Sequence, residues 1–261
     1  MNVRNPKFLI GAAVGAAVAI AVALILVSVL GGGSDDTQAA VTQTTTRAGT
    51  LPVEPDGGAG TTPAAPARLP GAAETNALFK GVPQRLNELG RHGAPVTMIE
   101  FADLQCPYCK AYALDGLPGI VQDYVRAGKV KLIFSGMSFI GPESEQALRA
   151  VYAAGLQGKL WNYLDLLYRN QGAENSGWVN DQLIRSAATS IPGLDADKLI
   201  ADMSSPEVDA ALQAAQQQAA SAKVNSTPTF FAGPTGQTLQ QINLNALTTD
   251  AFRPTLDQLT E

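Results

Sequence analysis

Residues 96–109 have the sequence VTMIEFADLQCPYC, and this stretch decides the fold. Its first six residues are mostly apolar and β-branched, which predicts a short buried strand. Cys106 and Cys109 follow this strand, and apolar residues then recur at helical spacing until Gly128. A C-x-x-C pair that lies where a strand ends and a helix begins has the context of a redox motif and not of an incidental pair of cysteines.

The residues after the cysteine pair extend this pattern into a strand–helix–strand unit. Pro118 lies within the predicted helix and is expected to kink it, because proline removes one internal hydrogen bond. The sequence VKLIF at residues 130–134 predicts a second strand. The crossover between the two strands favours a parallel pair.

The remainder of the chain completes an α/β domain. Apolar residues recur at helical spacing through residues 140–205, which predicts an α-helical insertion. Strand character returns at residues 227–233 and near 239–242, and residues 249–259 are typical of a closing helix. We therefore expect one folded domain over residues 78–261, with the insertion at about 140–205.

Residues 8–30 form an apolar run without a charged side chain. As a helix this run is long enough to cross a hydrocarbon core of about 30 Å. Arg4 and Lys7 precede it and Asp35 follows it, so the positive-inside rule places residues 1–7 in the cytoplasm and the rest of the chain outside. The alternative is a cleaved signal peptide, but its apolar region is usually only about 7 to 15 residues long, which favours an uncleaved anchor.

Residues 31–77 are rich in Gly, Ala, Thr and Pro and contain few large apolar side chains. Such a segment cannot bury enough surface to offset the entropy lost on ordering, so we expect a disordered linker. With the apolar run, this organisation predicts a single-pass membrane protein whose folded domain lies outside the cell membrane.

Composition excludes several classes of function. The chain has 261 residues and a formal net charge of -5, and its Lys and Arg residues are scattered, so nucleic acid is not an expected partner. Two cysteines three positions apart cannot close the long loops of a structural disulfide framework. A zinc site lacks a second ligand pair, because His92 is the only histidine. We expect neither metal nor cofactor, and an inert disulfide or half of a zinc site remains the alternative.

The two cysteines are expected to differ in reactivity. Backbone N–H groups and the positive end of the helix dipole at a helix N-terminus stabilise a thiolate, which lowers the thiol pKa below its ordinary value of about 8.5. Cys106 is therefore the expected nucleophile, facing solvent. Cys109, one turn further into the helix, is expected to be less exposed and to act as the resolving thiol.

Three features together resemble the DsbA-like branch of the thioredoxin superfamily. They are the run from Gly93 through Cys109, the helical insertion, and Ser226-Thr227-Pro228-Thr229-Phe230. The resemblance covers roughly the last two-thirds of the chain. It implies a thioredoxin-like fold, a cis-proline at Pro228 beside the active-site disulfide, and a backbone at Thr227 that pairs with an extended substrate segment.

The same resemblance implies further site residues. Glu100 matches the buried acid of these proteins and is expected to relay a proton to Cys109, the alternative being a partly solvated carboxylate at the end of a strand. Pro107 and Tyr108 are expected to contact substrate. The sequence departs from the family at Tyr108, where the strongest oxidants have His, and tyrosine supplies no positive charge to stabilise a thiolate. Asp103 lies near the pair and receives no role from the sequence.

Three functions follow from these residues. The first is thiol–disulfide exchange on exported proteins with cysteine thiols, as a disulfide donor that a membrane redox partner resets. The second is a reductase or isomerase of the same fold, fed by a membrane electron donor. The third is an anchored chaperone or metal-binding module that uses the groove beside Pro228 without turnover. No residue in the sequence fixes the direction of exchange between the first two.

Overall fold

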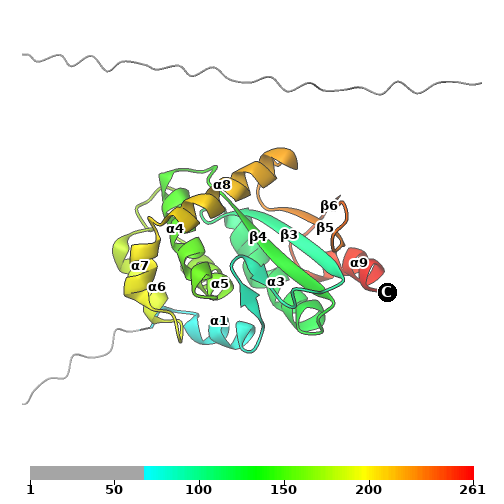
Figure 1. Cartoon of the computed structure of the whole chain (residues 1–261), viewed down its shortest axis with the longest axis horizontal. Coiled ribbons are helices and arrows are strands. Elements are labelled where there is room, and N and C mark those ends of the chain that lie inside the picture. The colour runs from blue at the N-terminus through cyan, green and yellow to red at the C-terminus, as the bar shows by residue number, and fades with distance from the viewer. Residues whose placement is uncertain (1–67) are drawn as a thin grey trace, which may run out of the picture. The chain divides into compact units, whose positions relative to one another are not determined.

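The computed structural model describes residues 68–261, and a six-stranded sheet in the order β1-β2-β4-β3-β5-β6 lies at its centre (Figure 1). The strands are β1 (Gln84–Arg85), β2 (Glu88–Leu89), β3 (Val96–Asp103), β4 (Val130–Met137), β5 (Thr229–Pro234) and β6 (Gln240–Ile242). All eight residues of β3 are buried. This strand therefore forms the middle of the domain, and its last residues lie next to the cysteine pair.

The predicted parallel pair is confirmed, because β3 and β4 run parallel from Val96 opposite Val130 to Asp103 opposite Met137. On its other side β3 pairs antiparallel with β5, so the strand that follows Pro228 lies directly beside the strand that precedes the cysteines. Segments that are far apart in the sequence thus meet at one end of the sheet.

The helix after β3 is interrupted around Pro118. It consists of α2 (Pro107–Ala111), a π-helical turn η1 (Tyr112–Gly116), α3 (Leu117–Ile120) and a second π-helical turn η2 (Val121–Val125). Proline has no backbone N–H, so the helix lacks one internal hydrogen bond at Pro118. The expected kink takes the form of a wider π-helical turn on either side of α3. Gly119 is required by packing, since a Cβ there would lie 2.3 Å from the hydroxyl oxygen of Thr249.

The helical insertion is confirmed. Its helices gather beside the sheet, at the left of Figure 1, and α8 returns the chain across the sheet toward β5. Within the expected range of about 140–205 the helices are α4 (Pro142–Leu156), α5 (Leu160–Arg169), α6 (Asp181–Thr189) and α7 (Ala196–Asp202). Helix α8 (Pro206–Ser221) follows them, and the closing helix after β6 is α9 (Thr249–Thr260). Side chains of Asn180, Asp195 and Ser205 cap the N-termini of α6, α7 and α8, as expected for these residue types.

The expected boundary between linker and domain at residue 78 is wrong. Helix α1 spans Ala72–Phe79, and its Leu78 and Phe79 are buried in the main core. The Thr75 hydroxyl donates to the carboxylate of Asp165 and so attaches α1 to α5. The composition of residues 31–77 hides this helix because its large apolar residues come only at its end. The short strands β1 and β2 were likewise not expected.

The remaining predictions about the N-terminal region lie outside the described residues. These are the cytoplasmic segment 1–7, the membrane anchor 8–30 and the linker up to residue 67. Among residues 68–261, no helix has both the length and the apolar character needed to cross a membrane.

Candidate active site

The cysteine pair lies at the junction between the centre of the sheet and α2. Cys106 is the residue that precedes α2, with an extended backbone, and Pro107 occupies the first helical position. Proline is well suited to this position, because its missing N–H is one that a helix N-terminus leaves unpaired. Cys109 lies in the first turn of α2 and is fully buried, as expected for the resolving thiol.

Cys106 is less exposed than expected. Only 5% of its surface reaches solvent. Cys106 was expected to face solvent, but the structure buries most of it. The cause is the segment before β5: the Cys106 Sγ lies 3.4 Å from the carbonyl oxygen of Thr227 and donates a hydrogen bond to it in the thiol form. The backbone of Thr227 therefore covers part of the Cys106 sulfur.

The pKa values of the two thiols are shifted in opposite directions. The pKa of Cys106 is lowered to about 6, first by a hydrogen bond from the Cys109 thiol and, against the cost of burial, by the Thr227 side chain and the backbone N–H groups of Cys109 and Tyr108. The pKa of Cys109 is raised, first by burial and then by its hydrogen bond to Cys106. The helix N-terminus thus contributes to the thiolate, but the neighbouring thiol contributes more.

The Thr227–Pro228 peptide bond is cis, as the resemblance implied. Beside it lies a groove of about 320 Å³. Tyr108, Thr227 and Pro228 line this groove together with Leu244 and Leu247. The Tyr108 side chain is 67% exposed and stands at the edge of the groove. Cys106 does not line the groove, but its sulfur contacts the carbonyl oxygen of Thr227, which does.

Glu100 lies in β3 behind the cysteine pair and is 2% exposed, so it is not the partly solvated carboxylate of the alternative interpretation. Burial raises its pKa to about 8. Its charge also raises the pKa of Cys109, which places the two groups within electrostatic reach. A carboxyl group with this pKa is protonated at neutral pH and can exchange a proton with a neighbouring thiolate.

Tyr112 is a further group behind the pair that the sequence did not indicate. Its hydroxyl and the Glu100 Oε1 are both buried, and neither has a hydrogen-bond partner among the described residues. Burial and the charge of Glu100 raise the pKa of Tyr112. Its ring packs on Phe230 of β5 with the ring centroids 4.6 Å apart. Tyr112 thus connects the helix that carries Cys109 with the strand that follows Pro228.

Asp103, which had no assigned role, holds the loop between β3 and α2. Its carboxylate accepts hydrogen bonds from the Ser144 hydroxyl at 2.6 Å and from the backbone N–H groups of Gln105 and Ile140 at 2.9 and 3.1 Å. The carboxylate therefore serves to fix the loop in place at the end of β3.

Two side chains of the insertion also hold this loop. The Gln171 side chain donates to the carbonyl oxygens of Leu104 at 2.7 Å and Cys106 at 3.1 Å. The Tyr168 hydroxyl donates to the carbonyl oxygen of Asp103 at 3.3 Å. Sequence reasoning missed both residues because they lie about 65 positions from their partners and belong to no local motif. The insertion thus positions the backbone that carries the nucleophile.

The described residues show no group of three or more His, Cys, Asp and Glu side chains that could hold a metal ion. His92 lies on the surface, where its Nδ1 is 3.0 Å from the Glu88 carboxylate. The zinc alternative requires further ligands next to Cys106 and Cys109, and His92 is not one of them.

Comparisons with known proteins agree with this geometry. The thioredoxin family model matches residues 85–251. A probable disulfide bond formation protein D from Bacillus cereus is 30% identical over 146 residues, which are 55% of this chain and 68% of that protein.

Solved structures show the same fold. The crystal structure of oxidised BdbD from Bacillus subtilis matches with a TM-score of 0.58 at 22% identity, over 69% of this chain and 97% of that chain. A thioredoxin-like oxidoreductase from Silicibacter pomeroyi matches with a TM-score of 0.51 at 26% identity, over 70% of this chain and 95% of that chain. From the family match and the cysteine pair beside the cis-proline we conclude that the chain belongs to the thioredoxin family and is a thiol–disulfide oxidoreductase.

Proposed function

We propose that the protein donates its Cys106–Cys109 disulfide to exported proteins that carry cysteine thiols. The observation that carries this proposal is the lowered pKa of Cys106. A thiolate that the protein stabilises makes the reduced pair more favourable, and this raises the oxidising strength of the corresponding disulfide. The pair is therefore better suited to accept electrons from a substrate than to supply them.

The exchange proceeds in two steps. A substrate thiolate attacks the Cys106 sulfur, the bond between Cys106 and Cys109 breaks, and Cys109 leaves as a thiolate while a mixed disulfide forms. Glu100, protonated at neutral pH, supplies the proton that Cys109 takes up. A second substrate thiolate then attacks the substrate sulfur of the mixed disulfide and releases the Cys106 thiolate. The substrate loses two electrons and the cysteine pair gains them.

The groove at Thr227 and Pro228 supports the proposed recognition of unfolded or extended substrates. A peptide in this groove would pair with the backbone at Thr227, and Pro107 and Tyr108 would contact its side chains. Such recognition uses mainly backbone groups, so it suits a protein that acts on many different sequences.

The location and the partner of the protein complete the proposal. Residues 8–30 would anchor the chain with its folded domain outside the cytoplasmic membrane, where disulfides persist. A membrane redox partner would then reoxidise the pair after each exchange. The alternative direction is a reductase or isomerase that receives electrons from a membrane donor.

The reduction potential of the pair tests the direction of exchange. We expect a value more oxidising than about -180 mV, on a scale that runs from about -120 mV for the strong oxidant DsbA to about -270 mV for the reductant thioredoxin. The measurement is equilibration with glutathione buffers of known ratio, followed by mass spectrometry of the alkylated protein. A value near that of thioredoxin would contradict the proposed donor and favour the reductase.

The alkylation rate of the reduced protein tests the thiolate on which the proposal depends. We expect the rate of iodoacetamide modification of Cys106 to rise with a midpoint near pH 6, because the thiolate is the reactive form. At pH 7, about ten thiolates would then be present for each thiol. Modification of Cys109 should stay slow over the same range. A midpoint near the ordinary thiol value of about 8.5 would instead support the non-catalytic binding module.

A further inference from the structure

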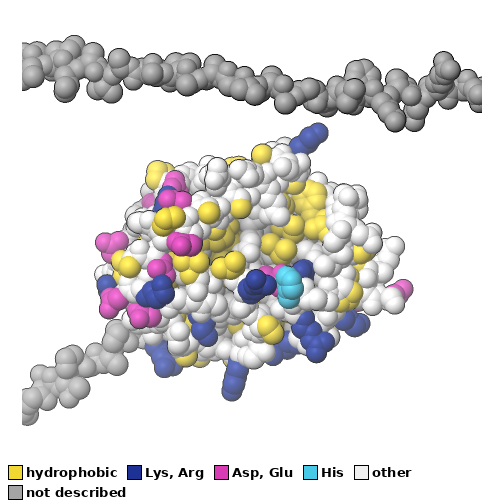
Figure 2. Space-filling model, viewed as in Figure 1, with side chains coloured by type: hydrophobic (Ala, Val, Ile, Leu, Met, Phe, Trp, Pro, Cys, Tyr) yellow, Lys and Arg dark blue, Asp and Glu magenta, His cyan; other side chains and the backbone are white. Residues whose placement is uncertain are grey.

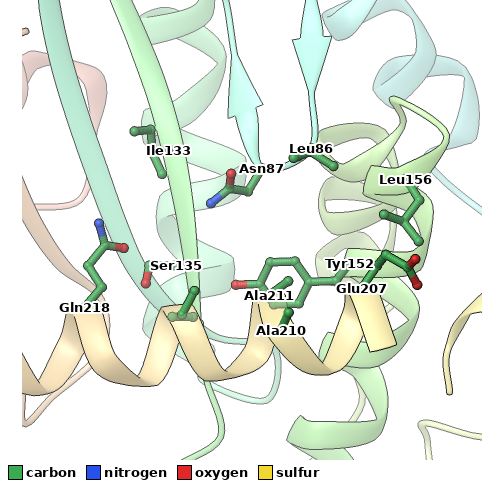
Figure 3. A pocket seen from close by; sticks show the side chains of 12 residues that line it. Leu86, Asn87, Ile133, Ser135, Tyr152, Leu156, Glu207, Ala210, Ala211 and Gln218 are labelled. Atoms are coloured by element: carbon green, nitrogen blue, oxygen red, sulfur yellow. The ribbon is translucent and has the colours of Figure 1, made fainter. Parts of the chain in front are cut away.

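A second cavity, of about 690 Å³, lies apart from the cysteine pair and shares no lining residue with the groove at Pro228. It is enclosed by β4, α4, α8 and the turn between β1 and β2 (Figure 3). Figure 2 shows apolar side chains gathered along α8 on this face of the domain. The volume falls within the range of about 300 to 1,000 Å³ that is typical of small-molecule sites.

The walls of this cavity are small and apolar. Helix α8 contributes Ala211, Ala214 and Ala215, whose short side chains leave space between the helix and the sheet. Ile133 of β4 and Leu156 of α4 line the cavity from other sides. The surface that a ligand meets is therefore mainly apolar, and removing the apolar surface of a ligand from water would favour its binding.

Ser135 provides one polar group in this apolar environment. It follows Ile133 by two positions in β4, so both side chains point to the same face of the sheet, toward α8. Ser135 is 1% exposed, and its hydroxyl has no hydrogen-bond partner among the described residues. Leaving a buried hydroxyl without a hydrogen-bond partner is unfavourable, and a ligand oxygen that reached this group would supply the missing partner.

The charge around the cavity restricts the ligand further. Glu207, in the first turn of α8, is the one charged side chain that lines it within residues 68–261, and neither Lys nor Arg does so. A carboxylate or phosphate inside the cavity would meet a like charge and find no cation to offset the loss of its hydration. The lining therefore disfavours an anion.

We propose that this cavity binds an uncharged small molecule with an apolar body and one hydroxyl or carbonyl group. The apolar body lies between the sheet and the alanine face of α8, and the oxygen forms a hydrogen bond with Ser135. This site is separate from the exchange reaction, so its occupancy does not require the cysteines. Disulfide exchange could proceed unchanged even if the proposed ligand did not bind.

Photoaffinity labelling of the full chain tests the proposal. The probe is decanol with a diazirine in its chain, and the labelled positions are mapped by mass spectrometry of peptides. We expect the label to concentrate in residues 130–137 and 206–221. Unlabelled decanol should compete at least tenfold better than decanoate, which has the same chain length and a negative charge. Label spread evenly over the domain, or equal competition by the two compounds, would overturn the proposal.

Substitutions on α8 provide the matched controls. Ala211→Leu fills the cavity and should reduce labelling at least tenfold, whereas Ala220→Leu adds the same side chain at an exposed position that does not line the cavity. Ala214→Leu, at a more exposed lining position, serves as the second variant if Ala211→Leu fails to fold. Ser135→Ala should weaken labelling by decanol severalfold. Equal labelling of the Ala211→Leu and Ala220→Leu proteins would show that the cavity is not the site, while unchanged disulfide exchange in both would show that the fold is intact.

Discussion

Replacing Cys109 with alanine is expected to stop turnover and to leave substrates covalently attached to Cys106. The first attack can still occur when Cys106 carries a disulfide to a small thiol, but Cys109 can then neither reverse it by attacking the Cys106 sulfur nor re-form the disulfide of the pair. Conjugates therefore persist wherever the substrate has no second thiolate in reach. We expect turnover with a reduced substrate protein to fall on the order of a thousandfold, as for other losses of a directly reacting group. The measurement is non-reducing gel electrophoresis of the alkylated protein in cells, followed by mass spectrometry of the conjugates.

The same substitution has a second expected effect on Cys106. The hydrogen bond from the Cys109 thiol is the largest cause of the lowered pKa of Cys106, so its removal should move the alkylation midpoint above pH 6. The Cys106→Ala protein is the matched control and should capture nothing, because Cys109 is fully buried. An absence of conjugates on the Cys109→Ala protein, in cells with abundant exported thiols, would count against exchange as the function.

The parts of the fold that the sequence predicted depend on local patterns. The apolar run at the start of β3, the helical spacing after Cys109 and the run that forms β4 each lie within one element, so periodicity identifies them. Helix α1 and strands β1 and β2 are too short for a clear period. Their formation depends on tertiary contacts such as the burial of Phe79 and Leu89, which periodicity does not indicate.

The same distinction holds for the site. The strand-to-helix position of Cys106 and Cys109 follows from neighbouring residues, and the cis-proline followed from the resemblance. The hydrogen bonds of Asp103 with Ser144 and of Gln171 with the Cys106 carbonyl join residues about 40 to 65 positions apart. No single-sequence pattern brings such residues together. The sequence also placed Cys106 at the surface, because it could not show that Thr227 lies against its sulfur.

Replacing Glu100 with glutamine is expected to stabilise the oxidised protein increasingly as pH rises. The pKa of Glu100 is raised from 4.5 to about 8 in the folded state, so the neutral acid is favoured by folding. Its contribution to stability is therefore fully present below about pH 4.5 and is lost as pH rises toward 8, because the unfolded chain ionises first. The substitution should therefore raise the free energy of unfolding by roughly 3 kcal/mol more at pH 7 than it does at pH 4.

Urea unfolding of the oxidised proteins between pH 4 and pH 9 measures this gain, since the two cysteines do not titrate while they are joined. Tyr112→Phe is the matched control: it removes a buried hydroxyl without a partner among the described residues, so its effect on stability should not change with pH in this range. The same carboxyl group supplies the proton to Cys109 in the proposed exchange, and Glu100→Gln should therefore slow turnover at pH 7 by about 10² or more while the Cys106 thiolate persists. A stability difference that is flat with pH would mean that Glu100 ionises freely in the folded protein, and the carboxyl would then have no proton to give at neutral pH.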